Sequence, residues 1–176
     1  GYFALPAWFN KLIEEGSLGQ KSKRGVYKKV GKEIHVLDVA THTYSLSEGK
    51  ADDAVKDMLS ERDWAKKLAA LRDSKNPQAQ FLWCLLRDTF HYCATQLESI
   101  ADNARDLDLA VRWGFGWDSG PFEIWQAAGW QQVAGWINAD IAAGKTMAKV
   151  ALPAWVTEAG RSGVHTALGS YSPARN

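Results

Sequence analysis

The amino-acid sequence predicts a mainly α-helical fold with one small β-hairpin near the N-terminus. From residue 51 onward, apolar residues recur mostly at three- and four-residue steps between residues that cap helices. Alternation with a period of two is confined to residues 25–37. The chain has 176 residues, of which 46% are hydrophobic and 23% are charged, and this is enough for a folded core without disulfides.

The N-terminal part is predicted to hold one helix and the hairpin. Residues 5–15 are predicted to form a short helix, with Pro6 suited to its first turn and Gly16 suited to the position after its last turn. Its apolar stripe consists of Trp8, Phe9, Leu12 and Ile13. Two short apolar runs on either side of Gly31-Lys32 predict the hairpin over residues 25–37. Residues 41–49 are polar, and we expect them to be a loop.

Helix signals dominate from residue 51. Residues 60–63 (Ser-Glu-Arg-Asp) resemble a capping box that opens a helix running to about Arg72. Asn76-Pro77 is expected to start the longest helix, which continues to about Ala101. Three shorter helices are predicted at residues 106–113, 121–129 and 131–143. A turn-rich break at residues 114–120 separates the first of them from the second. The longest helix is expected to face the core with Phe81, Leu85, Tyr92, Leu97 and Ile100.

A short internal repeat suggests a duplicated module. Leu-Pro-Ala-Trp at residues 5–8 recurs at 152–155, and a glycine and a Gly-x-Tyr triplet follow each copy in the same order. The repeat predicts three parts: the tail of a first helical module with the hairpin at 1–37, a connecting segment with one or two helices at 38–79, and a second, complete module at 80–176. We therefore expect the chain, which starts at Gly1 without a methionine, to be an excised piece of a longer protein.

The composition excludes several classes of protein. A net charge of +1 argues against a nucleic-acid binder, and no apolar run reaches the roughly 18 residues of a membrane span. Cys84 and Cys93 lie nine residues apart in one predicted helix, on opposite faces, so we expect no disulfide. This cysteine usage is typical of a reducing, cytoplasmic compartment.

The most specific motif lies between two predicted helices, at residues 113–123 (Trp-Gly-Phe-Gly-Trp-Asp-Ser-Gly-Pro-Phe-Glu). Its glycine spacing is not that of a dinucleotide-binding fingerprint, and a helical pattern precedes it where that fingerprint requires a strand. We favour a tight turn joining two packed helices over a direct ligand role. The residues assigned to this structural motif are Gly114, Gly116, Gly120, Pro121, Phe122 and Glu123.

Two compositional features have both a structural and a ligand-binding interpretation. Nine tryptophans are present, five of them between residues 113 and 136, and a core or domain interface is favoured over base stacking or an acyl-chain groove. Six cations fall within twelve residues, and a solvated face is favoured over a phosphate contact. These cations are Lys21, Lys23, Arg24, Lys28, Lys29 and Lys32.

No residue is assigned a catalytic, cofactor-binding or metal-binding role. His91 lies three residues after Asp88 in the longest predicted helix, which permits a contact, but no nucleophile is placed beside the pair. His35, His42 and His165 lack the spacing of metal ligands.

The glycine motif resembles a known family. Residues 108–123 are similar to the C-terminal helical module of 3-hydroxyacyl-CoA dehydrogenases, and residues 5–8, 19–21 and 25–27 are similar to the end of the same module. Long members of that family carry two such modules in tandem after a Rossmann NAD domain, the arrangement that the repeat suggests. The resemblance covers residues 5–37 and 80–172, and it implies a helical C-terminal 3-hydroxyacyl-CoA dehydrogenase-like module.

The sequence also departs from the family pattern. Trp-Asp-Ser at 117–119 replaces a usual proline, and Gln126 lies where an acidic residue is usual. The family's catalytic histidine and glutamate lie in the NAD domain and its active-site asparagine lies early in the first helical module. None of the three has a matching position here, so no catalytic residue is carried over.

The expectation is a C-terminal fragment of an NAD-dependent oxidoreductase, a 3-hydroxyacyl-CoA dehydrogenase of fatty-acid β-oxidation. The resemblance implies that the fragment helps to close the acyl-CoA cleft and packs domains or subunits, and that the missing NAD domain is its partner. The resemblance is also compatible with a parent enzyme that carries a fused enoyl-CoA hydratase domain. NAD and acyl-CoA would bind the parent enzyme, whereas the fragment would bind no NAD and be inactive alone. The alternatives are a non-enzymatic α-helical interaction module, and an acidic-partner or nucleic-acid binder acting through residues 21–32.

Overall fold

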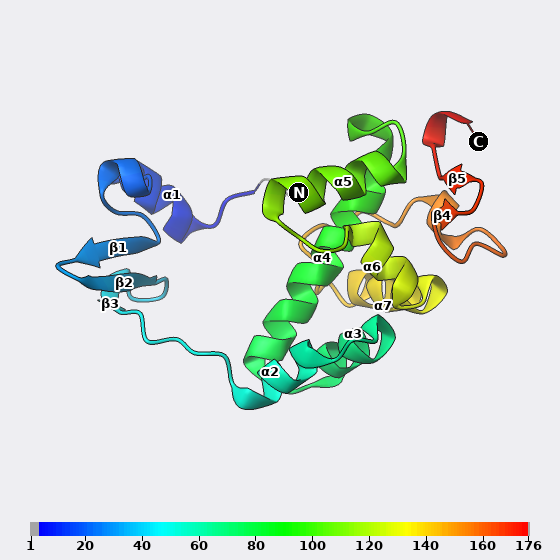
Figure 1. Ribbon diagram of the computed structural model, residues 1–176. Helices are drawn as coiled ribbons and strands as arrows, with labels where there is room; N and C mark the ends of the chain where they lie inside the picture. The colour runs from blue at the N-terminus through cyan, green and yellow to red at the C-terminus, as the bar shows by residue number, and fades with distance from the viewer. Residues whose placement is uncertain (1–3, 176) are drawn as a thin grey trace. The chain divides into compact units, whose positions relative to one another are not determined.

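The computed structural model describes residues 4–175 and divides the chain into two compact units (Figure 1). The N-terminal unit comprises residues up to 50 and the helical unit begins at residue 51. The prediction of a mainly α fold is confirmed, because helices make up most of the helical unit. No helix among residues 4–175 is long and apolar enough to cross a membrane.

The N-terminal unit contains one α-helix, a 3-10 turn and a three-stranded antiparallel sheet. The sheet has the order β1-β2-β3, and the first two strands form the predicted hairpin. Leu12 from the helix and Leu37 from the central strand are both buried, and His42 lies 3.3 Å from the carboxylate of Glu15. The elements are α1 (Ala7–Glu14), η1 (Gln20–Ser22), β1 (Tyr27–Val30), β2 (Glu33–Asp38) and β3 (Thr43–Leu46).

The third strand corrects the prediction of a loop at residues 41–49. Thr43–Leu46 pairs with β2, with Tyr44 opposite Leu37 and Ser45 opposite Val36. The segment alternates polar and apolar side chains over only four residues, which is too short for the pattern to stand out. Asp38 makes the turn into this strand, because its carboxylate accepts hydrogen bonds from the backbone N–H groups of Ala40 and Thr41.

The helical unit contains six α-helices among its described residues, followed by a segment with two short strands. Its longest helix, α4, contacts α3, α5 and α6. The helices are α2 (Asp53–Ser60), α3 (Trp64–Asp73), α4 (Pro77–Ile100), α5 (Ala104–Phe115), α6 (Pro121–Ala127) and α7 (Trp130–Ala142). The segment that follows holds η2 (Ala154–Thr157), β4 (His165–Thr166), β5 (Gly169–Ser170) and η3 (Pro173–Arg175).

The helix starts agree with the sequence prediction at Asn76-Pro77 and Pro121, but not at Ser60. Ser60 is the last residue of α2, where its hydroxyl donates to the carbonyl oxygen of Asp57. Asp63 caps α3 instead, because its carboxylate accepts from the N–H groups of Ala65 and Lys66. Aspartate and serine are equally good N-caps, so the capping signal alone could not separate the two positions.

The predicted core face of α4 is largely wrong. Phe81 is 65% exposed, and Leu85 and Ile100 are also exposed, whereas Leu97 is buried as expected. The helix has apolar residues on both sides, and the inner side is the one with spacings of four and three residues. It includes a charged residue, Arg87, which a search for apolar periodicity skips. The inner residues of this helix are Trp83, Arg87, Phe90, Ala94 and Leu97.

Aromatic rings fill the core of the helical unit. Trp125 and Trp130 stack with ring centroids 4.4 Å apart, and their indole N–H groups donate to the carbonyl oxygens of Trp130 and Val156. Trp155 stacks on Tyr171 at 4.6 Å. The prediction that tryptophans form core is thus confirmed for Trp125 and Trp130. Trp113 is 78% exposed and lies outside this core, so for this residue the alternative, a domain interface, stays a prediction.

Both cysteines are free, as the sequence predicts. Cys93 is buried on the inner side of α4, and burial raises the pKa of its thiol to about 12. Cys84 is only half-buried.

Candidate functional site

The glycine motif forms the junction between α5 and α6. Gly114 lies inside the last turn of α5, so the predicted break starts at Gly116 and not at Gly114. Gly116 ends α5 with φ 68° and ψ 30°, a left-handed conformation that costs glycine little and other residues more. Gly120 precedes Pro121, which is the first residue of α6.

Asp108 of α5 supplies the cap of α6. This residue is 1% exposed, and its carboxylate accepts from the N–H groups of Phe122 at 2.8 Å and Glu123 at 3.1 Å. Gly120 has no side chain with which to cap the helix, and a Cβ at this position would lie 2.3 Å from Cβ of Asp108. The absence of that Cβ lets the carboxylate reach the helix start, where its charge is favourable.

Glu123 completes the start of α6 from the other direction. Its carboxylate accepts from the N–H of Gly120 at 2.7 Å and lies 3.2 Å from the guanidinium of Arg112. Phe122 points into the core and is fully buried. The six residues assigned from the sequence therefore lie together at one helix junction, although Gly114 and Gly116 are exposed and make no packing contact through a missing side chain.

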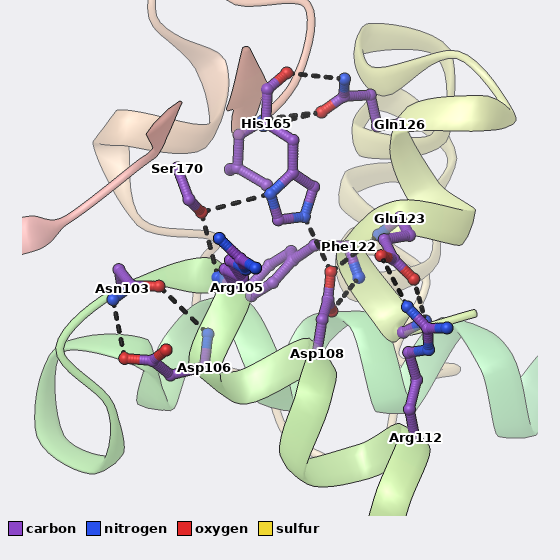
Figure 2. A network of polar contacts seen from close by, with 12 residues as sticks. Asn103, Arg105, Asp106, Asp108, Arg112, Phe122, Glu123, Gln126, His165 and Ser170 are labelled. Carbon is purple, nitrogen blue, oxygen red and sulfur yellow. Dashed lines mark hydrogen bonds and ion pairs between the residues drawn. The ribbon is translucent and has the colours of Figure 1, made fainter. Parts of the chain in front are cut away.

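A histidine from the last part of the chain closes over this junction (Figure 2). His165 of β4 lies with Nε2 2.8 Å from the carboxylate of Asp108 and Nδ1 3.2 Å from the hydroxyl of Ser170. The same hydroxyl accepts from the backbone N–H of Arg105 at 3.0 Å. Residues 105, 108, 165 and 170 thus form one continuous polar network that joins α5, the start of α6 and the β4–β5 hairpin.

Gln126 fixes the backbone of His165. Its side-chain oxygen accepts from the N–H groups of Val164 and His165, and its NH₂ group donates to the carbonyl oxygen of His165 at 2.9 Å. A Cβ on Gly163 would lie 2.0 Å from the same amide oxygen. Since a carboxylate has no hydrogen to donate, an acidic residue could accept the first two bonds but not make the third.

The network has the order carboxylate–imidazole–hydroxyl. Nucleophilic catalysis also requires N–H groups that can stabilise an oxyanion, and the N–H groups beside this network do not meet that requirement. In this order Nε2–H donates to Asp108 and Nδ1 accepts from the Ser170 hydroxyl. The neighbouring N–H groups of Ala104 and Arg105 already donate to Tyr171 and Ser170, so neither can stabilise an oxyanion. The arrangement holds three segments together, and sequence reasoning missed it because Asp108 and His165 are 57 positions apart.

A second buried charge lies on the inner side of α4. The guanidinium of Arg87 donates to the carboxylates of Asp88 and Asp140 at 3.0 Å each and to the carbonyl oxygen of Lys145 at 2.7 Å. Burial acts to lower the pKa of Arg87, but its bonds to the two carboxylates outweigh this effect and raise it. The indole N–H of Trp83 also donates to Asp140 at 3.1 Å.

His91 is buried one turn farther along α4. Its Nε2 donates to the carbonyl oxygen of Val150 at 2.7 Å, while the Asp88 carboxylate accepts from Arg87 and from the N–H of Met147. Burial lowers the pKa of His91, although the bond to Val150 opposes this effect. The charge of Asp88 also acts to raise the pKa of His91, and the two residues together hold the segment after α7 against α4.

The junction does not fit the pyrophosphate of NAD. A dinucleotide site requires free N–H groups at the start of a helix that follows a strand. Here a helix precedes the glycines, and the N–H groups of Gly120, Phe122 and Glu123 are already bonded to Glu123 and Asp108. Among residues 4–175, no group of three or more His, Cys, Asp or Glu side chains could hold a metal ion.

The fold and the junction define a mainly α module in which a glycine turn is capped by a buried carboxylate. A protein of Bacillus subtilis strain 168 named Probable 3-hydroxyacyl-CoA dehydrogenase is 37% identical over 132 residues, which are 75% of this chain and 17% of that protein. Proteins of Rickettsia felis and Rickettsia prowazekii, whose names include fatty acid oxidation complex trifunctional enzyme, are 29% and 25% identical over 75% and 76% of the chain. Each of these two is covered over 18% of its length.

The chain is homologous to a region of 3-hydroxyacyl-CoA dehydrogenases, as the glycine motif predicted. It spans less than a fifth of the length of the curated relatives it matches. No protein-family profile matches the chain, and no solved structure matches it.

Proposed function

We propose that this chain is the C-terminal helical region of an NAD-dependent 3-hydroxyacyl-CoA dehydrogenase of fatty-acid β-oxidation. Its task is to close the acyl-CoA cleft and to pack against the NAD-binding domain or another subunit, while hydride transfer takes place outside it. The observation that carries the proposal is the 37% identity to a dehydrogenase relative over three quarters of the chain. In the tandem organisation, residues 1–37 are the end of a first module and residues 80–176 form a second module. Residues 38–79 connect the two modules.

The contacts at the junction favour a structural role for the helical unit. Its polar groups bond to one another: Asp108 to the start of α6 and to His165, and Glu123 to Gly120 and Arg112. Such a network holds helices in fixed relative positions. Exposed apolar side chains of α4 and α5 supply area for packing against another domain or subunit. They are Phe81, Leu85, Trp113 and Phe115.

Two finer points belong to the same proposal. The names of the Rickettsia relatives favour a parent protein that also carries an enoyl-CoA hydratase domain. The free cysteines Cys84 and Cys93 favour a reducing compartment such as the cytoplasm. On this proposal, NAD is bound and used by the parent enzyme, and this region binds none.

A domain exchange tests the proposal. The matching 132-residue region of the Bacillus subtilis relative is replaced by that of this chain, and oxidation of 3-hydroxybutyryl-CoA is followed through NADH absorbance. We expect the chimera to oxidise the substrate and the isolated 176-residue chain to show no turnover. Turnover by the isolated chain would contradict the supporting role, and a folded but inactive chimera would contradict the assignment.

The alternative, a non-enzymatic helical interaction module, predicts a different result. It also accounts for the exposed apolar residues of α4 and α5. A module of that kind would leave the chimera folded but inactive in the same assay. The chimera therefore separates the two functions.

A further inference from the structure

The first fifty residues concentrate positive charge. They contain eight Lys and Arg against five Asp and Glu, a net charge of +3, whereas the remaining residues carry thirteen against fifteen, a net charge of −2. Six of the eight cations lie between residues 21 and 32, in η1, β1 and the turns that follow them. The glycine junction in the helical unit makes no use of this charge.

One side of the β1–β2–β3 sheet exposes apolar and aromatic groups beside these cations. The strand register places Tyr27 opposite Val36 and Lys29 opposite Ile34, so these four side chains share one side, which we call the Tyr27 face. Tyr27 is 59% exposed and Ile34 is 48% exposed. The opposite side carries the buried Leu37. A solvated sheet face is usually polar, so an exposed tyrosine and isoleucine between lysines mark a surface suited to a ligand.

A cavity of about 830 Å³ extends from the Tyr27 face to the loop before β1. Its lining includes Gly19, Gln20, Lys23, Tyr27, Lys29 and Ile34. This volume lies in the range of cavities that bind cofactor-sized molecules. Within residues 4–175, no carboxylate forms an ion pair with Lys23 or Lys29, whereas Lys28 lies over the ring of Tyr44 at 4.2 Å.

The loop that carries Lys23 is held in one conformation. The Ser22 hydroxyl accepts from the N–H of Leu18 at 2.8 Å and lies 2.9 Å from the carbonyl oxygen of Arg24. Lys23 itself adopts φ 63°, which is uncommon for a residue other than glycine, and its N–H donates to Gln20. A Cβ on Gly25 would lie 2.9 Å from Cα of Gly19, so the loop closes tightly on the strand. A fixed loop loses little entropy when a ligand binds.

We propose that the Tyr27 face and its loop bind the 3′-phosphoadenosine diphosphate end of an acyl-CoA. Tyr27 stacks on the adenine, and Lys23 and Lys29 take the phosphates, for which lysine acts as a point charge. The apolar surface of Ile34 receives the start of the pantetheine arm. This inference rests on the proposed function, because acyl-CoA is the substrate proposed there. A single aromatic over one cavity fits one base better than the extended groove of a nucleic-acid strand.

Calorimetric titration of the 176-residue chain tests the site directly. The ligands are CoA, 3′-dephospho-CoA and NAD, all at the same ionic strength because phosphate binding depends on salt. We expect CoA to bind most tightly and loss of the 3′-phosphate to weaken binding about fivefold, the effect of one exposed charge pair. Equal affinity for CoA and 3′-dephospho-CoA, or no binding of CoA at about 1 mM, would overturn the proposal.

Matched variants locate the binding. Tyr27→Ala and the double change Lys23→Gln with Lys29→Gln should each weaken CoA binding about tenfold. Lys32→Gln removes a cation of the same stretch that does not line the cavity, and it should change the affinity less than twofold. Circular dichroism confirms that each variant is folded. An equal loss of CoA affinity in Lys32→Gln would show that only the overall positive charge of the segment matters, which would contradict the proposed site. Tighter binding of a short single-stranded RNA than of CoA would favour nucleic-acid binding instead.

The domain-exchange enzyme separates this inference from the proposed function. In an active chimera that contains residues 19–37 of this chain, the lysine double variant should raise KM for 3-hydroxybutyryl-CoA with kcat unchanged, as expected for a contact remote from the reacting atoms. If the chimera is active and its KM is the same with and without these substitutions, the CoA site is contradicted and the proposed function is not. An inactive chimera alongside CoA binding by the chain would remove only the dehydrogenase assignment.

Discussion

Two of the buried charged side chains of the helical unit, Asp108 and Arg87, are stabilised in opposite ways. Asp108 is surrounded by neutral donors, the backbone N–H groups that start α6, and by the imidazole of His165. Arg87 is held by the full charges of Asp88 and Asp140. The first arrangement fixes a helix start, and the second fixes α4 against α7. A buried charge thus marks, in each case, the place where segments distant in the sequence are joined.

The largest effect is expected at Asp108, since its loss leaves several donors without a partner at once. Asp108→Ala should lower the free energy of unfolding by about 4 kcal/mol, because two buried helix N–H groups and His165 lose their acceptor. The exposed Asp118 in the same turn provides the matched control. Urea denaturation followed by circular dichroism measures both variants. A loss below about 1 kcal/mol for Asp108→Ala would show that water replaces the carboxylate.

Removal of the opposite charge should cost somewhat less. Arg87→Met retains most of the packing volume but leaves Asp140 with only the indole N–H of Trp83 among the partners described here, so we expect a loss of about 3 kcal/mol. Asp88 is partly exposed, and water can solvate it. The exposed Arg62, changed in the same way, should have an effect within about 0.5 kcal/mol. A neutral result for Arg87→Met would mean that apolar packing replaces the ionic cluster without loss.

Substitution of the three glycines of the motif by alanine should change the free energy of unfolding by different amounts, because each glycine has a different structural role. Gly120→Ala places a Cβ against Asp108 and should cost about 2 kcal/mol, and Gly116→Ala should cost about 1 kcal/mol through its positive φ. Gly114→Ala lies in a helix with nothing within 4 Å of the new Cβ, so it should be neutral or stabilise by up to about 1 kcal/mol. The midpoints of thermal unfolding give the order. A loss at Gly114 as large as that at Gly120 would contradict the geometry.

The smallest effect is the pH dependence due to His91. Its pKa is lowered in the folded protein, so the unfolded chain binds more protons once the pH falls below about 6.5. The stability contributed by the neutral imidazole is complete above this value and decreases as the pH falls toward the folded-state pKa. His91→Gln keeps a donor for Val150 and should flatten the change in stability between about pH 7.5 and 5. An unchanged slope would assign that pH dependence to other groups.

Local signals predicted the elements better than the contacts among them. Asn76-Pro77, Pro121 and Gly144 mark helix ends through their own backbone chemistry, and the structure confirms each. The inner face of α4 was missed because both sides of the helix carry apolar residues and Arg87 interrupts the inner one. The sequence motif located the helix junction, but His165 reaches it through a fold that no local pattern encodes.

The two cysteines of α4 also make this helix a reporter of its own opening. Maleimides react with thiolates, and the Cys93 thiol, with its pKa raised to about 12, remains protonated and covered while α4 is packed. Labelling of Cys93 therefore requires a transient separation of α4 from its neighbours, whereas the half-buried Cys84 can react without it. The ratio of the two labelling rates measures how often this part of the helical unit opens under native conditions.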